Sequence, residues 1–163
     1  MSTFKSLSKE DLQILLEMTA VADANWEVII ASQDTSLLSF IVQLFADDSA
    51  VKVRNIENGC DFMVACAREI PDLVILDTTI LSCSAVDMLQ CFRRNQCLKD
   101  VRVLCYATPD QSEKLFQSGA DDVITNESFD KVYLSRKMNS LLYRSSLHKK
   151  RRLKPERERR WPR

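Results

Sequence analysis

Five short apolar segments alternate with five amphipathic segments along most of this chain, and this alternation constrains the fold more than any other feature. The apolar segments are rich in β-branched residues and have the length of strands: 27–31, 50–56, 72–76, 101–107 and 121–125. Each precedes a segment with apolar side chains at helical spacing: 35–46, 59–69, 84–95, 109–118 and 128 onward. This order predicts a doubly wound α/β domain, with a five-stranded parallel sheet and helices on both faces.

Capping residues predict where two of these helices begin and end. Thr108 is followed by Pro109, and Gln111 completes a capping box three residues after the threonine. Gly119 is placed to end the same helix. Ser128 is predicted to open the last helix.

The chain is predicted to have one domain and two extensions. Residues 26–147 form the α/β domain, and residues 1–25 form an N-terminal helical extension. Within that extension, residues 8–18 have leucines on one side of a helix and are expected to pack on the domain or on a partner. Residues 148–163 form a basic tail or linker.

The cysteine and histidine content argues against a metal site. His148 is the only histidine, and no two of the 6 cysteines have the C-x-x-C spacing of a zinc site. We expect reduced, partly buried thiols, no metal and no cofactor. No apolar run approaches the roughly 18 residues of a membrane span and no signal peptide opens the chain, so we expect a cytoplasmic protein without membrane contact.

One carboxylate stands at the end of a strongly apolar run. In PDLVILD the apolar residues lead directly to Asp77. Chemistry in parallel sheets takes place at the carboxyl ends of the strands, so Asp77 is a candidate reactive group. The alternative is an ordinary strand-end residue that binds nearby amides and hydroxyls, such as those of Ser32, Thr78 and Thr79.

Residues 26–143 resemble the receiver domain of bacterial two-component response regulators. The resemblance rests on PDLVILD, on SGADDVIT before the last helix, and on the order and length of the five units. It implies a phosphoryl group accepted by Asp77 and Mg²⁺ held by an acidic pair after the first strand. It also implies a Thr or Ser after the fourth strand and a Lys after the fifth, both on the phosphoryl oxygens, with a cis Pro following the Lys.

Of these family positions the chain retains only the acceptor. Other residues replace the rest: Ser32 and Gln33 the acidic pair, Tyr106 the Thr or Ser, Asn126 the Lys, and Glu127 the Pro. Mg²⁺ prefers carboxylate oxygens, and phosphoryl transfer depends on positioned charge. The sequence therefore predicts a degenerate phosphoacceptor site without catalytic residues and a trans peptide before Glu127. The resemblance also implies that the Asp34 side chain points away from the metal position.

The tail allows three interpretations. Residues 148–163 carry nine of the 23 Lys and Arg side chains, which is typical of a solvated end. The sequence argues against binding to nucleic acid, because Trp161 is the tail's single aromatic residue and the rest of the chain is acidic. RERRWPR also resembles the opening of a PilZ domain, which implies that Arg159 and Arg163 contact cyclic di-GMP only if a PilZ barrel follows.

These residues together favour a pseudo-receiver, a response-regulator module that signals by protein contact with little or no phosphoryl transfer and is not an enzyme. Its partner is expected to be another protein or a C-terminal effector domain. We also expect a homodimer, formed through the helix at 8–18 or through the fourth and fifth helices of the domain. Two alternatives stay open: a working phosphorelay receiver phosphorylated on Asp77, and a nucleic-acid-binding protein that uses the tail.

Overall fold

The computed structural model of the chain describes residues 25–79, 83–128 and 130–153, with side chains as far as Ser145 apart from that of Ser128. The helix predicted at 8–18 lies outside the described residues. So do Arg159 and Arg163 of the tail, so the interpretations of both extensions stay predictions.

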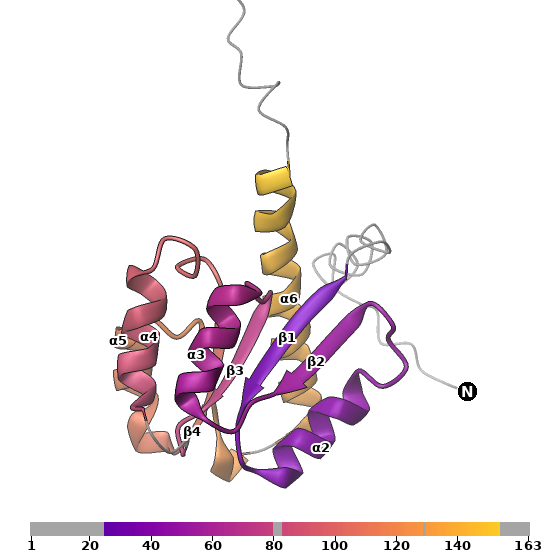
Figure 1. Cartoon of the computed structure of the whole chain (residues 1–163). Coiled ribbons are helices and arrows are strands. Elements are labelled where there is room, and N and C mark those ends of the chain that lie inside the picture. The colour runs from indigo at the N-terminus through magenta and orange to yellow at the C-terminus, as the bar shows by residue number, and fades with distance from the viewer. Residues whose placement is uncertain (1–24, 80–82, 129, 154–163) are drawn as a thin grey trace, which may run out of the picture.

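The sheet has five parallel strands, as predicted, and their order is β2-β1-β3-β4-β5 (Figure 1). Pairing of β3 with β4 puts Asp77 directly opposite Tyr106. Asp77 is the last residue of its strand rather than the residue after it, so the predicted bounds were one residue early. The strands are β1 (Trp26–Ala31), β2 (Val51–Asn55), β3 (Leu73–Asp77), β4 (Arg102–Ala107) and β5 (Asp122–Thr125).

Helices cover both faces of this sheet (Figure 1). One face carries α3 (Gly59–Arg68), α4 (Ala85–Arg94) and α5 (Ser112–Ser118). The other carries α2 (Thr35–Leu44) and α6 (Lys131–Leu153). Short 3₁₀ turns precede α5 and α6: η1 (Pro109–Gln111) and η2 (Asn126–Ser128).

The two cores alternate along each strand. In β3, Val74 and Leu76 face α3 and α4, whereas Leu73 and Ile75 face α2 and α6. Because both faces of the strand are covered, its apolar run is continuous rather than alternating. Phe62 of α3 and Phe92 of α4 stack in the first core with their ring centroids 6.0 Å apart.

Helix ends match the predicted caps in part. Gly119 ends α5 with φ 113°, and Gln111 accepts a 3.4 Å hydrogen bond from the Thr108 amide, so both predictions are confirmed. The prediction for the last helix was wrong, because Ser128 belongs to η2. Asp130 precedes α6 instead and accepts a 2.9 Å hydrogen bond from the Val132 amide.

One helix, α6, extends well past the sheet (Figure 1). It has 23 residues, and its buried part is joined to the sheet by Ser145, whose hydroxyl lies 3.5 Å from the Asp72 carboxylate. The other oxygen of Asp72 accepts a 2.8 Å hydrogen bond from the Glu27 amide. Among the helices of the described residues, none combines the length and apolarity that a membrane crossing requires.

Candidate functional site

Asp77 is held by both of its carboxylate oxygens at the carboxyl edge of the sheet. The Ser32 hydroxyl donates to Oδ2 at 2.6 Å. The amide and the hydroxyl of Thr79 donate to Oδ1 at 2.9 and 2.8 Å. Asp77 is 1% exposed and Ser32 is fully buried, so this carboxylate is a satisfied buried group.

Ser32 connects Asp77 to the start of α2. Its oxygen accepts a 3.0 Å hydrogen bond from the Asp34 amide while its proton goes to Asp77. Asp34 then caps α2, because its Oδ1 accepts from the amides of Ser36 and Leu37 at 2.9 and 3.1 Å. The loop after β1 is therefore fixed by a chain of short polar contacts.

Tyr106 lies beside Asp77 on the neighbouring strand. Its hydroxyl is 3.5 Å from the free carboxylate oxygen of Asp34, a long contact. Burial, followed by the negative charges of Asp34 and Asp77, raises the pKa of Tyr106 above its ordinary value. Tyr106 therefore stays neutral, and its hydroxyl is directed at the Asp34 carboxylate.

The structure brings together some of the residues predicted for this site and separates others. Ser32, Tyr106 and Asp77 meet, whereas Gln33 and Asn126 are exposed. Thr78 was expected on the Asp77 carboxylate, which was wrong: its hydroxyl donates to Gln111 Oε1 at 2.8 Å and its amide to the Tyr106 carbonyl at 3.0 Å.

The site offers little to a cation. Of the Asp34 carboxylate, one oxygen is committed to the α2 amides, and the part of the chain that the structure describes contains no group of three or more His, Cys, Asp and Glu placed to hold a metal. Mg²⁺ binds through carboxylates and water in near-octahedral geometry. The bond between Asn126 and Glu127 is trans, as predicted, since the described residues contain no cis peptide.

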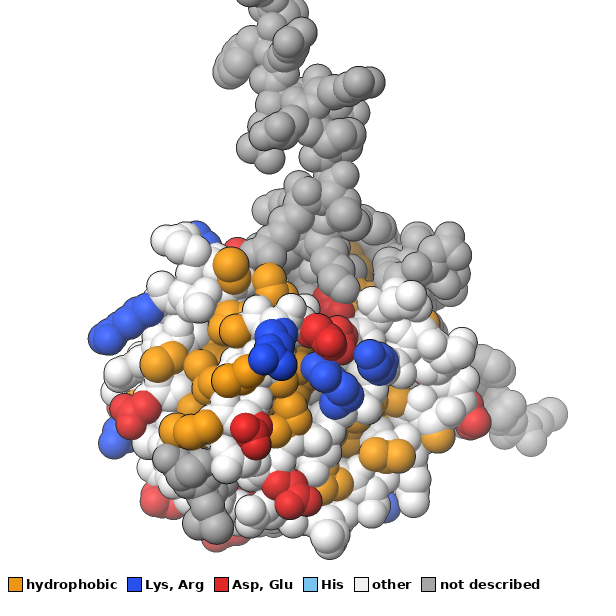
Figure 2. Space-filling view, viewed as in Figure 1, with side chains coloured by type: hydrophobic (Ala, Val, Ile, Leu, Met, Phe, Trp, Pro, Cys, Tyr) orange, Lys and Arg blue, Asp and Glu red, His pale blue; other side chains and the backbone are white. Residues whose placement is uncertain are grey.

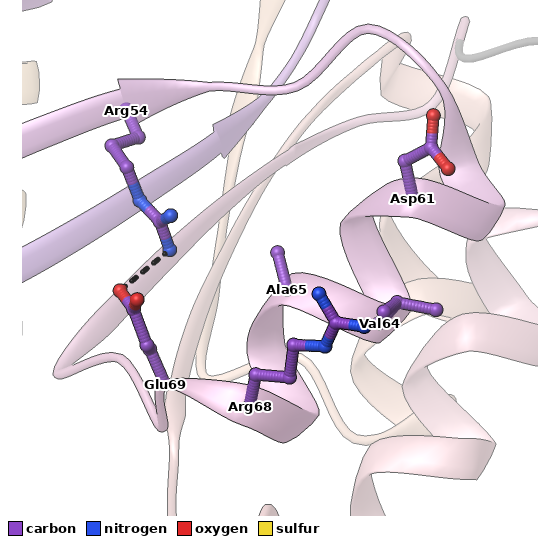
Figure 3. Close-up of a pocket in the computed structure, with 6 residues that line it drawn as sticks. All are labelled: Arg54, Asp61, Val64, Ala65, Arg68 and Glu69. Atoms are coloured by element: carbon purple, nitrogen blue, oxygen red, sulfur yellow. Dashed lines mark ion pairs between the residues drawn. The ribbon is translucent and has the colours of Figure 1, made fainter.

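Away from Asp77, a concavity lies between β2 and α3. It measures about 270 Å³ and Figure 3 shows Arg54 reaching across it toward Glu69, with Nη2 and Oε2 3.1 Å apart. Figure 2 shows basic and acidic side chains intermixed over this edge of the sheet, where Glu27 pairs with both Lys52 and Arg54. The lining charges are two arginines and two acids, Arg54, Arg68, Asp61 and Glu69, so the groove favours neither an anion nor a cation.

Comparison with known proteins gives matches in structure only. No family model and no curated protein sequence matches the chain. The signal receiver domain of a protein assigned as a LuxO repressor in Vibrio parahaemolyticus matches with TM-score 0.67 and 24% identity, covering 77% of this chain and 95% of its own. The receiver fold is shared. A DNA-binding response regulator of the LuxR family from Staphylococcus aureus matches this receiver fold with TM-score 0.61 and 23% identity, covering 72% and 98%.

Another receiver match carries a metal. The receiver domain of a sensor histidine kinase from Pseudomonas aeruginosa PAO1 has TM-score 0.63 and 14% identity, covers 73% of this chain and 98% of its own, and holds a magnesium ion in its active-site cleft. At such identities the likeness shows the receiver fold. The chemistry of the site follows from the residues of this chain.

Two structural residues of this receiver fold escaped the sequence analysis. Asp34 caps α2, and its place directly before Thr35 is a signal that could have revealed the cap. Arg93 of α4 donates to the carbonyls of Lys99, Val101 and Gly119 and to the Asp121 carboxylate, at 2.6 to 2.9 Å. Nothing in the sequence around Arg93 indicates this, because its acceptors belong to two other loops.

Proposed function

We propose that this chain is a pseudo-receiver: a signalling module that acts through protein contact and takes up little or no phosphate at Asp77. The supporting observation is that the Asp77 carboxylate is buried and fully hydrogen-bonded. Both oxygens already accept hydrogen bonds, and the side chain is 1% exposed. An attacking carboxylate oxygen has to leave such partners, at a cost comparable to losing a hydrogen bond to a charged group.

The charge around Asp77 supports the same proposal. The groups that contact it are hydroxyls and an amide, and the next carboxylate is Asp34, beyond Ser32. Phosphoryl transfer relies on fixed positive charge to neutralise the incoming oxygens. A neutral Ser32 and an exposed Asn126 supply no such charge.

Phosphorylation from a small donor tests the proposal. The full chain is incubated with acetyl phosphate and Mg²⁺ and its intact mass is measured, with Asp77→Asn treated in parallel. We expect no phosphoryl adduct on either protein. A stoichiometric adduct on the wild-type chain that is lost in Asp77→Asn would overturn the proposal and favour the working phosphorelay receiver.

A module that phosphate does not switch needs a surface that stays available to a partner. We propose a homodimer through α5, β5 and the adjoining side of α6. Phe116, Val132 and Tyr133 expose apolar surface there, and Lys137 of α6 joins this side to β5 through its 2.6 Å ion pair with Asp122. The alternative surface, the helix predicted at 8–18, lies outside the described residues.

The tail interpretation also remains a proposal. Cyclic di-GMP is expected to contact Arg159 and Arg163 only if a PilZ barrel follows them, since two arginines form an incomplete site for a dinucleotide. Other partners are a protein or a C-terminal effector domain.

A further inference from the structure

A groove opens between the starts of α4 and α5, at the same edge of the sheet as Asp77. It measures about 330 Å³, and Val86 and Leu115 contribute apolar surface to its lining. Thr78 and Gln111 also line it, and the 2.8 Å hydrogen bond between their side chains joins the end of β3 to η1. The groove is therefore partly apolar, and its walls are connected to one another.

Acidic side chains flank this groove on both sides. Asp87 lies in the first turn of α4, Asp110 in η1, and Glu113 in the first turn of α5. All three are exposed, and none of them belongs to an ion pair within the described part of the chain. Among the described residues that line the groove, Lys114 is the one base. The surroundings of the groove are therefore negative and favour a cationic partner.

The neighbouring loops extend this negative surface along the edge of the sheet. Glu57 follows β2, Glu127 and Asp130 follow β5, and all three side chains are exposed. Lys131 is a base at the same edge, and its ammonium lies over the Phe40 ring, 5.6 Å from the centroid. A basic segment is therefore attracted to this edge before it reaches the groove.

The chain itself contains a segment with the complementary chemistry. Residues 148–163 carry nine Lys and Arg side chains, and Trp161 lies among the arginines. Tryptophan and arginine are the residue types that most often anchor protein interfaces. We propose that the groove between α4 and α5 binds the segment around Trp161 of a second copy of this chain. The indole lies against Val86 and Leu115, and the arginines lie beside the flanking acids.

The length of the chain argues for a second copy rather than the same copy. Ser145 contacts Asp72 at the amino edge of the sheet, and α6 continues to Leu153, about 12 Å further away. The groove lies at the opposite edge, beyond the 6 residues of β4, which span roughly 20 Å (Figure 1). The straight path from Leu153 to the groove is therefore about 30 Å. Fully extended, the chain from Leu153 to Trp161 reaches about 29 Å at most, and the domain stands in its path.

This contact differs from the dimer proposed through α5, β5 and α6, and it does not depend on the chemistry of Asp77. It is formed mainly by exposed opposite charges, which dissolved salt screens. We therefore expect it to weaken as the salt concentration rises. An interface that buries Phe116 and Val132 depends on apolar surface instead, so salt should not weaken it.

Photo-cross-linking of the full chain locates the bound segment. The photoreactive residue p-benzoylphenylalanine replaces Trp161, and equal amounts of unlabelled and ¹⁵N-labelled chain are mixed at low salt and irradiated. We expect cross-links to the peptides that contain Val86 or Leu115, and these should include pairs of one light and one heavy chain. Cross-links confined to chains of equal label would show that the tail binds its own domain, and an absence of cross-links to these peptides would equally overturn the proposal.

A binding experiment separates the groove from general attraction between charges. A fluorescent peptide of residues 148–163 is titrated with the full chain and followed by anisotropy. Glu113→Lys in the chain should weaken binding roughly fivefold, and Trp161→Ala in the peptide roughly tenfold. Asp47→Lys is the matched control, because Asp47 is exposed after α2 at the other edge of the sheet and the change in charge is the same.

The control variant should bind the peptide as the wild type does, and circular dichroism establishes that both variants are folded. Equal weakening by Glu113→Lys and Asp47→Lys would show that the peptide is held by overall charge alone. That result, or a peptide whose binding does not change with Trp161→Ala, would overturn the groove as the binding site.

Discussion

Tyr106 lies at the acidic edge of the sheet, and its phenol affects how the site responds to pH. Its hydroxyl faces Asp34, and Asp77 lies opposite on the adjacent strand. Ionising this tyrosine would place a third negative charge among two carboxylates. Burial of the phenol, followed by these two negative charges, therefore raises the pKa of Tyr106 and favours its neutral form.

The raised pKa predicts an alkaline loss of stability. Above the ordinary pKa of tyrosine the unfolded chain loses this proton while the folded chain keeps it, so the folded state binds more protons and the free energy of unfolding falls as pH rises. Below the ordinary pKa the protonation is equal in both states and the effect vanishes. Urea denaturation of wild type and Tyr106→Phe between neutral pH and about pH 11 measures this, and the wild type should lose more stability.

Tyr133→Phe provides the control for this titration, since its ring is exposed on α6. The difference in the free energy of unfolding between wild type and Tyr106→Phe should shrink or reverse only at alkaline pH. A difference that stays constant over the whole range would contradict the assignment of Tyr106 as a shifted group.

At the scale of whole elements, one side chain joins two loops to a helix. Arg93 of α4 donates to backbone carbonyls on both sides of β4, at Val101 and Gly119, and pairs with Asp121 at 2.9 Å. Gly119 ends α5 in the left-handed region, and a Cβ at this position would come within 2.6 Å of Arg93 Cγ. The arginine and the glycine thus depend on each other.

We predict a measurable coupling between these two residues. Arg93→Ala should reduce the free energy of unfolding by about 2–4 kcal/mol, because it removes the side-chain donor to three backbone carbonyls and one of the donors to Asp121. Gly119→Ala should cost roughly 1–3 kcal/mol from backbone strain and the clash with Arg93. In the double variant the clash is absent, so the total loss should be smaller than the sum by about 0.5 kcal/mol or more.

Denaturant unfolding of the four proteins in this cycle supplies the measurement. Arg94→Ala is the matched control, because Arg94 is exposed on the same helix and its loss should change stability by less than about 0.5 kcal/mol. Additive single effects would show that Arg93 and Gly119 act independently. Arg93→Lys should not restore stability, since an ammonium cannot reproduce the planar fork of donors.

The sequence was most informative about elements and less so about their ends and contacts. The five strands and their parallel arrangement could be predicted, because a β-branched apolar run covered on both faces has few other possible structures. The start of α6 could not, since Ser128 and Asp130 are both good caps and the choice depends on where η2 ends. The meeting of Ser32, Asp77 and Tyr106 followed from the topology, whereas the partner of Thr78 depended on the position of η1.

For the molecule as a whole, the exposed apolar side chains predict self-association. Phe116 and Val132 are 48% and 58% exposed on α5 and α6. If the proposed dimer buries them, the chain should sediment as a dimer at about 100 µM, because an interface of standard size normally forms below that concentration. Phe116→Glu and Val132→Glu should each shift the chain toward monomer by placing like charges across the two-fold interface.

Val42 supplies the control for this prediction. It is 55% exposed but lies on α2, away from α5 and β5, so Val42→Glu should leave the sedimentation unchanged. A wild-type chain that remains monomeric at this concentration would contradict the dimer. A dimer that all three variants leave intact would place the interface elsewhere.

The length of α6 has a consequence for the direction in which the chain leaves the domain. Ser145 is held against Asp72, and the helix then continues to Leu153 beyond the sheet, on the side away from Asp77. Each residue of an α-helix advances the chain by about 1.5 Å and turns it by about 100°. Removing one residue after Ser145 would therefore redirect the tail to another side of the domain. Removing seven residues corresponds to nearly two full turns of the helix, so the chain would leave α6 in almost the same direction but about 10 Å closer to the sheet.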